Sequence, residues 1–277
     1  MHPIIVVGGA RIVAWAALVA AGVVLSWALL LRRTHRLGYR RLPVFLWVLF
    51  AFPAGALFAN VAAGLVLAAV GRAGWAVGEL GANGLTVLGS IFACVVFSVV
   101  YIRLVFREAP WRLLDAVAFT FPLSMMFGRL GCLLNGCCFG RVAPRALGPL
   151  TLPLGAYDPS TDAARFHAGL PSETPLWDLP LLLIASELVV LVAVEWSFRR
   201  RARLRLGDGA VICLALALDS AFRFGIEFAR GEEPVARSGW ANPWQLVAGA
   251  FAVVAALGFV TRARAGGRRA AVEAVSS

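Results

Sequence analysis

The sequence has few charged residues and no lysine. Only 15% of its 277 residues are charged and 60% are hydrophobic, which is far more apolar than an average soluble domain. Apolar runs of about 20 residues recur along the chain, and each is long enough to cross about 30 Å of hydrocarbon. Because one soluble core does not need so many such runs, the composition predicts a membrane protein.

Since lysine is absent, arginine alone supplies the 26 basic side chains and the net charge of +11. These arginines lie in short connections between the apolar runs, as the positive-inside bias predicts for a protein with several membrane spans. This distribution argues against a nucleic-acid partner.

Hydropathy predicts an all-α, polytopic transmembrane bundle of about seven spans. They are expected at 11–31, 43–70, 85–106, 113–135, 178–198, 209–228 and 243–261. Arginine is concentrated in the first, third and fifth connections and in the tail, which we therefore expect in the cytoplasm of a bacterium, with the amino terminus outside. The sequence thus predicts an inner-membrane protein with one transmembrane domain over 1–262. A basic cytoplasmic tail is expected over 263–277, near anionic membrane lipids.

The chain also lacks an internal repeat, so a transporter built from inverted repeats is not favoured. Its longest connection, 136–177, contains six prolines and no clear periodicity. Connections of this length are usually functional or disordered. We expect a partly ordered outer cap over a site in the membrane.

Ionisable side chains inside membrane spans are costly unless they are paired or face a wet cavity. Asp219, Arg223, Glu227 and Arg230 are spaced so that they share one helix face with alternating charge. They form either a set of structural salt bridges or an anion site in which carboxylates hold the arginines. Further ionisable residues in apolar regions are Asp115, Arg129, Glu187 and Glu195.

The segment 128–141, GRLGCLLNGCCFGR, is unusually rich in glycine for the end of a membrane helix. Its glycines allow close approach either of another helix or of a lipid, while Arg129 and Asn135 add polar atoms. Both interpretations stay open on composition alone.

The same segment contains three cysteines, Cys132, Cys137 and Cys138. The three histidines of the chain show no spacing that would complete a zinc site, so we expect no metal. A disulfide from Cys132 to Cys137 or Cys138, a reactive thiolate beside arginine, and plain packing of small side chains remain possible.

Two segments resemble the prolipoprotein diacylglyceryl transferase family. Residues 128–141 match its signature GRxGNxxNxExxGR at Gly128, Arg129, Gly131, Asn135, Gly140 and Arg141. Residues 221–230, AFRFGIEFAR, resemble its AFRxxxEFxR and carry Arg223, Glu227 and Arg230. Weaker similarities are Asp115 before Pro122, the triplet 176–178 and Gln245 in the last span.

The resemblance implies transfer of a diacylglyceryl group from phosphatidylglycerol to the lipobox cysteine of a prolipoprotein, without metal or cofactor. Phosphatidylglycerol, membrane lipids and prolipoprotein signal peptides would be the partners. By this resemblance Arg129 and Arg223 would hold the lipid phosphate, and Glu227 would orient Arg223. The remaining expected substrate-binding residues are Asn135, Gly140, Arg141, Cys132, Arg230 and Gln245.

The sequence departs from the family where thiol activation is expected. Leu88-Gly89-Ser90 replaces a His-Gly-Gly, and Asp219 replaces a tyrosine four residues before Arg223. We expect Asp219 to serve as the replacement base. Two alternatives stay open: a non-catalytic phospholipid-binding relative, and a transporter, which the clustering of intramembrane charges toward the outer side disfavours.

Overall fold

The computed structural model describes residues 4–7, 10–69, 85–136, 138–144, 150–231 and 243–276. Within these ranges the chain is mostly helical, in agreement with the predicted all-α class. Its contacts divide it into two compact units, Met1–Leu29 with Ala118–Ser277, and Leu30–Val117. We call these unit 1 and unit 2 and describe each separately.

Unit 2 is built on two apolar helices, α2 (Arg41–Ala69) and α3 (Leu85–Tyr101), which pack against each other. Their contact includes a buried hydrogen bond of 2.9 Å from Trp47 Nε1 to Ser98 Oγ. One turn of π-helix, η2 (Ile102–Phe106), follows α3, and the short helix α4 (Pro110–Val117) completes the unit. The predicted span 85–106 is therefore helical to its end, with a change of helix type at residue 102.

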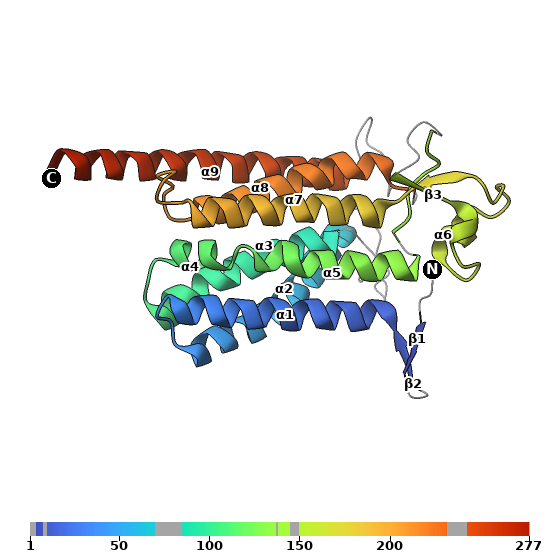
Figure 1. Ribbon diagram of the computed structural model, residues 1–277, viewed down its shortest axis with the longest axis horizontal. Helices are drawn as coiled ribbons and strands as arrows, with labels where there is room; N and C mark the ends of the chain where they lie inside the picture. The colour runs from blue at the N-terminus through green and yellow to red at the C-terminus, as the bar shows by residue number, and fades with distance from the viewer. Residues whose placement is uncertain are drawn as a thin grey trace. The chain divides into compact units, whose positions relative to one another are not determined.

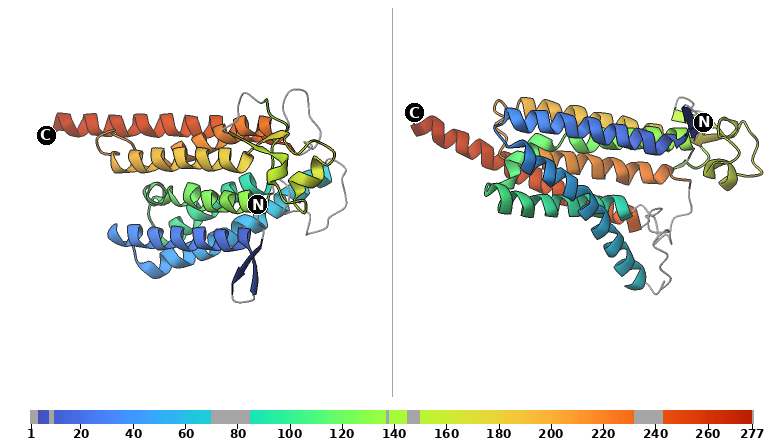
Figure 2. Two further views of the ribbon diagram at one scale, coloured as in Figure 1. Left: turned by 45° about the vertical axis from the view of Figure 1, so that its right-hand side comes forward. Right: turned by 90° about the horizontal axis from the view of Figure 1, so that it is seen from below.

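Unit 1 contains the start of α1 (Ala14–Arg36), preceded by a hairpin of β1 (Ile4–Val7) and β2 (Ala10–Val13), and four further long helices. These are α5 (Thr120–Asn135), α7 (Leu179–Arg199), α8 (Ala210–Ile226) and α9 (Pro243–Ser276). Helix α7 packs against both α5 and α8, and α8 packs against α9, so these helices lie side by side (Figures 1 and 2). This arrangement lets side chains of α5, α7 and α8 meet.

Among the described residues, four stretches are long and apolar enough to cross a membrane: Ala14–Arg36, Pro110–Asn135, Leu179–Arg199 and Gln245–Arg268. The second of these, Pro110–Asn135, contains a break that hydropathy did not predict, since α4 ends at Val117 and α5 begins at Thr120. The other predicted spans coincide with α2, α3 and α8, and a total of seven stays a prediction. Helix α9 continues to Ser276, so the expected tail is helical through that residue.

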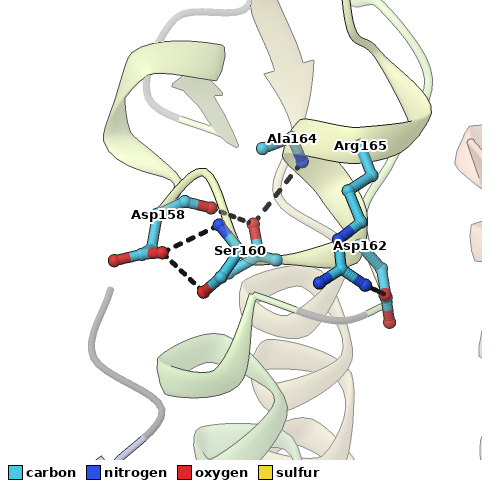
Figure 3. Close-up of polar contacts among 6 residues, drawn as sticks. Asp158, Ser160, Asp162, Ala164 and Arg165 are labelled. Carbon is cyan, nitrogen blue, oxygen red and sulfur yellow. Dashed lines mark hydrogen bonds and ion pairs between the residues drawn. The ribbon is translucent and has the colours of Figure 1, made fainter.

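The long connection after α5 contains regular structure in its described part. Strand β3 (Thr151–Pro153) pairs antiparallel with β4 (Pro175–Trp177), and a 3-10 turn, η4 (Leu154–Ala156), follows β3. Between them lies α6 (Asp162–Phe166), whose first turn is capped by the Thr161 hydroxyl, which accepts from Ala164 N at 3.5 Å (Figure 3). A small apolar core forms beneath these elements: Phe139, Leu154, Tyr157, Ala163 and Leu176.

Candidate functional site

Three helices of unit 1 bring four charged side chains into one cluster. Arg129 lies on α5, Glu187 on α7, and Asp219 and Arg223 on α8. The Glu187 carboxyl lies within electrostatic reach of the other three. We call these four residues the charged cluster. Helix packing assembles it from segments that are far apart in the sequence.

The strongest contact in the charged cluster joins Arg223 to Asp219. Arg223 Nε lies 3.3 Å from Asp219 Oδ2 and 3.4 Å from Oδ1, one helical turn away. The side chains are only 14% and 3% exposed. Arg223 Nη2 is buried and has no hydrogen-bond partner among the described residues. A buried donor without a partner is rare and costly, so this nitrogen is available to an anionic ligand.

Glu227 and Arg230 form a second ion pair at the end of α8. Arg230 Nε donates to Glu227 Oε2 at 3.0 Å. This pair forms because α8 ends at Ile226 and passes into a 3-10 turn, η5 (Glu227–Ala229), which places residues three apart over one another. The carboxylate paired with Arg223 is thus that of Asp219, and the role expected for Glu227 stays a prediction.

Backbone hydrogen bonds tie the two signature segments to each other and the first of them to β4. Gly140 N donates to Trp177 O at 3.0 Å, and Arg141 N donates to Ala229 O at 3.0 Å. His167 Nε2 donates to Gly140 O at 3.3 Å from a buried position. A Cβ atom at Gly140 would overlap the backbone and side chain of Trp177. Only glycine therefore fits here, which is a packing reason for its presence in the signature.

The cysteines of the first signature lie beside Arg129. Arg129 Nη1 is 3.8 Å from Cys138 Sγ, and Cys138 Sγ is 4.0 Å from Cys132 Sγ. A disulfide needs about 2.05 Å between its sulfurs, so these two are thiols in contact. Cys137 lies outside the described residues. In the rest of the chain, as far as it is described, no group of three His, Cys, Asp or Glu side chains is arranged for a metal ion.

The other expected site residues occupy different surroundings. Gln245 is buried on α9, and its Nε2 donates to Phe224 O at 3.5 Å, next to Arg223. Asn135 is half-buried in the last turn of α5, and the Arg141 side chain is exposed. Gln245 thus joins α9 to the helix that carries the paired arginine.

Sequence reasoning did not assign Glu187 or His167 to the site. Glu187 was recognisable as a carboxyl inside an apolar helix, but its neighbours depend on how α7 packs. Tyr157, in the small apolar core of the connection after α5, also has no counterpart in the sequence-based expectations. Burial, assisted by the charge of Asp178, raises the pKa of its hydroxyl.

A sequence model of prolipoprotein diacylglyceryl transferase matches residues 3–261, which is most of the chain. The chain belongs to the prolipoprotein diacylglyceryl transferase family. This agrees with the resemblance found in the two signature segments, which the fold brings into contact.

Several curated relatives of this family carry the name phosphatidylglycerol–prolipoprotein diacylglyceryl transferase. The chain is 24% identical to that of Clostridium tetani over 228 residues, 81% of this chain and 83% of the relative. It is 26% identical to that of Campylobacter hominis over 151 residues, 54% and 46% of the two chains. It is 33% identical to that of Neisseria meningitidis serogroup C over 133 residues, which are 43% of this chain and 43% of the relative. The matched part thus spans less than half the length of the latter two relatives.

Proposed function

We propose that this protein transfers the diacylglyceryl group of phosphatidylglycerol to a thiol acceptor, the lipobox cysteine of prolipoproteins. The observation that carries the proposal is the buried Arg223 guanidinium, held by Asp219 and left with Nη2 unpartnered among the described residues. A planar guanidinium suits a phosphate, and it is most effective where water is excluded. Membership of the family supports the same ligand.

In the proposed reaction the acceptor sulfur bonds to the glyceryl carbon that carried the phosphate. The bond from this carbon to the phosphate oxygen breaks, and glycerol phosphate leaves with the electron pair. Arg129 and Arg223 stabilise the charge that develops on the leaving group. The thiol proton passes to a carboxylate, for which we propose Asp219. Asn135, Gly140, Arg141, Cys132, Arg230 and Gln245 shape the headgroup site, and Glu227 supports it through Arg230.

We further propose that the chain spans the bacterial inner membrane seven times, with its amino terminus outside. Four stretches long and apolar enough to cross support part of this topology, and the arginine-rich connections support its orientation. Residues 1–262 would form the transmembrane domain, and the cap over 136–177 would lie on the outer side, where prolipoprotein signal peptides are presented. Residues 263–277 would lie in the cytoplasm.

A second candidate is a phospholipid-binding relative that performs no transfer. The observation that favours it is the sequence Leu88-Gly89-Ser90 on α3, where the family carries His-Gly-Gly. Such a protein would keep the arginines and bind phosphatidylglycerol without turnover.

The test of the proposed function is rescue of a bacterium depleted of its own diacylglyceryl transferase. We expect the wild-type chain to restore growth and prolipoprotein maturation, and Arg129→Ala and Arg223→Ala to fail. Arg165→Ala is the matched control. The Arg165 side chain is 69% exposed, and within the described residues its one ion pair is with Asp162 at 3.9 Å. It should rescue like the wild type.

Failure of the wild type despite confirmed membrane expression would contradict transfer to prolipoproteins. Binding of phosphatidylglycerol by the purified protein would then identify the non-catalytic alternative.

A further inference from the structure

Glu187 is a buried carboxyl in the middle of the mostly apolar helix α7. It is 1% exposed, and its Oε2 accepts no hydrogen bond from any donor in the described residues. Glu195, two turns further along α7, instead pairs with Arg199 at 3.2 Å near the helix end. Because a carboxyl inside a membrane helix is costly, its presence at position 187 points to a role.

Glu187 has a specific neighbour among the charged side chains. Helix α7 packs against α8, and the buried Asp219 lies on α8. The Glu187 carboxyl is within hydrogen-bonding reach of that of Asp219, and Arg223 and Arg129 lie in its surroundings. Two carboxylates have no proton to donate, so this contact is favourable only when one proton lies between them. With that proton the carboxyl pair carries one negative charge.

The charge of the whole cluster then follows by counting. Arg129 and Arg223 contribute two positive charges, and the Glu187–Asp219 pair contributes one negative charge. The net single positive charge complements a singly charged phosphodiester, which is the headgroup chemistry of phosphatidylglycerol. With both carboxyls ionised the cluster would be neutral, and its net electrostatic attraction for an anion would be weaker.

We propose that Glu187 is a positioning residue of the anion site: hydrogen-bonded to Asp219, it fixes the carboxylate that holds Arg223, so that Arg223 Nη2 points to a phosphodiester. The inference rests on the proposed function and deepens it, because it adds a residue from a third helix and specifies the charge of the ligand. The effective part of Glu187 is its hydrogen-bond donor and not a negative charge.

This distinction defines the experiment. Glu187→Gln keeps a donor of nearly the same shape, whereas Glu187→Leu keeps the volume and removes the donor. Each purified variant is titrated calorimetrically with a short-chain phosphatidylglycerol, and its fold is checked by thermal unfolding in detergent. We expect Glu187→Gln to bind within about twofold of the wild type and Glu187→Leu to bind roughly tenfold more weakly or worse. Glu195→Leu is the matched control on the same helix and should bind like the wild type.

The outcomes separate the inference from the proposed function. If the wild type does not bind phosphatidylglycerol, both are wrong. If it binds and Glu187→Leu binds equally well, or Glu187→Gln is as weak as Glu187→Leu, only the role of Glu187 is wrong. If Glu187→Leu does not fold, Glu187→Met takes its place as the variant without a donor. In either case Glu187→Gln must bind within about twofold of the wild type, or the role of Glu187 is wrong.

Discussion

Replacing Arg223 by lysine separates the charge of this residue from its shape. Arg223 Nε faces Asp219 at 3.3 Å while Nη2 stays unpartnered within the described structure, so one guanidinium can hold a carboxylate and a phosphate together. Lysine has a single ammonium group on a flexible chain and cannot reproduce this fork. Arg223→Lys should therefore fold but bind its anion poorly.

The magnitude follows from the contact that is lost. A hydrogen bond to a charged group contributes about 1.5–3 kcal/mol, and about 1.4 kcal/mol corresponds to a tenfold change in rate. We expect Arg223→Lys to lower kcat/KM for phosphatidylglycerol by roughly 10- to 100-fold. Arg223→Ala would also leave the carboxylate of Asp219, which is 3% exposed, without its cation, and such losses cost about 3–5 kcal/mol of stability.

The assay measures release of glycerol phosphate from phosphatidylglycerol in the presence of a lipobox peptide, with thermal unfolding as the check on the fold. Arg199→Lys is the control, since Arg199 is 76% exposed and forms its ion pair with Glu195 at the end of α7. Activity of Arg223→Lys within twofold of the wild type would refute the argument. So would an equal loss in Arg199→Lys, because the effect would then not be specific to the buried fork.

Two further predictions concern the first signature segment. Gly140→Ala should lower the thermal stability by about 1–3 kcal/mol or prevent folding, because its Cβ would overlap Trp177 of β4. Gly225→Ala is the control and should be neutral, since the space at its Cβ is open. Equal melting temperatures of the Gly140→Ala and Gly225→Ala variants would contradict the packing argument. A thiol oxidant such as diamide should join Cys132 to Cys138, whose sulfurs are 4.0 Å apart, and so lower phosphatidylglycerol binding by moving Cys138 away from Arg129. Mass spectrometry of the peptides detects the bond, and an oxidised protein with unchanged affinity would show that the thiol contact has no part in the site.

The helices and the residues of the two signatures were predictable because both rest on local patterns. A membrane helix needs an apolar run of sufficient length, and α1, α7 and α9 begin within a few residues of the predicted positions. The i, i+4 spacing likewise placed Asp219 and Arg223 on one face, and the structure pairs them at 3.3 Å. These features need no knowledge of how helices pack.

The contacts between segments were not predictable in the same way. The meeting of Gly140 with Trp177 and of Arg141 with Ala229 depends on irregular backbone, which has no periodicity to read. The placement of Glu187 beside Asp219 depends on which face of α7 turns toward α8. Hydropathy identifies an apolar helix without specifying that rotation.

The charged cluster and the backbone contacts together indicate how this chain tolerates its departures from the family pattern. The segments that carry Arg129 and Arg223 are joined by hydrogen bonds from Arg141 N to Ala229 O and from Gly231 N to Phe139 O, which are all between main-chain atoms. Main-chain bonds do not depend on the side chains at which this sequence departs from the family, such as Asp219 in place of a tyrosine. In the proposed reaction, phosphate binding can therefore persist while thiol activation changes, and the Glu187–Asp219 pair, with one negative charge, would accept the thiol proton.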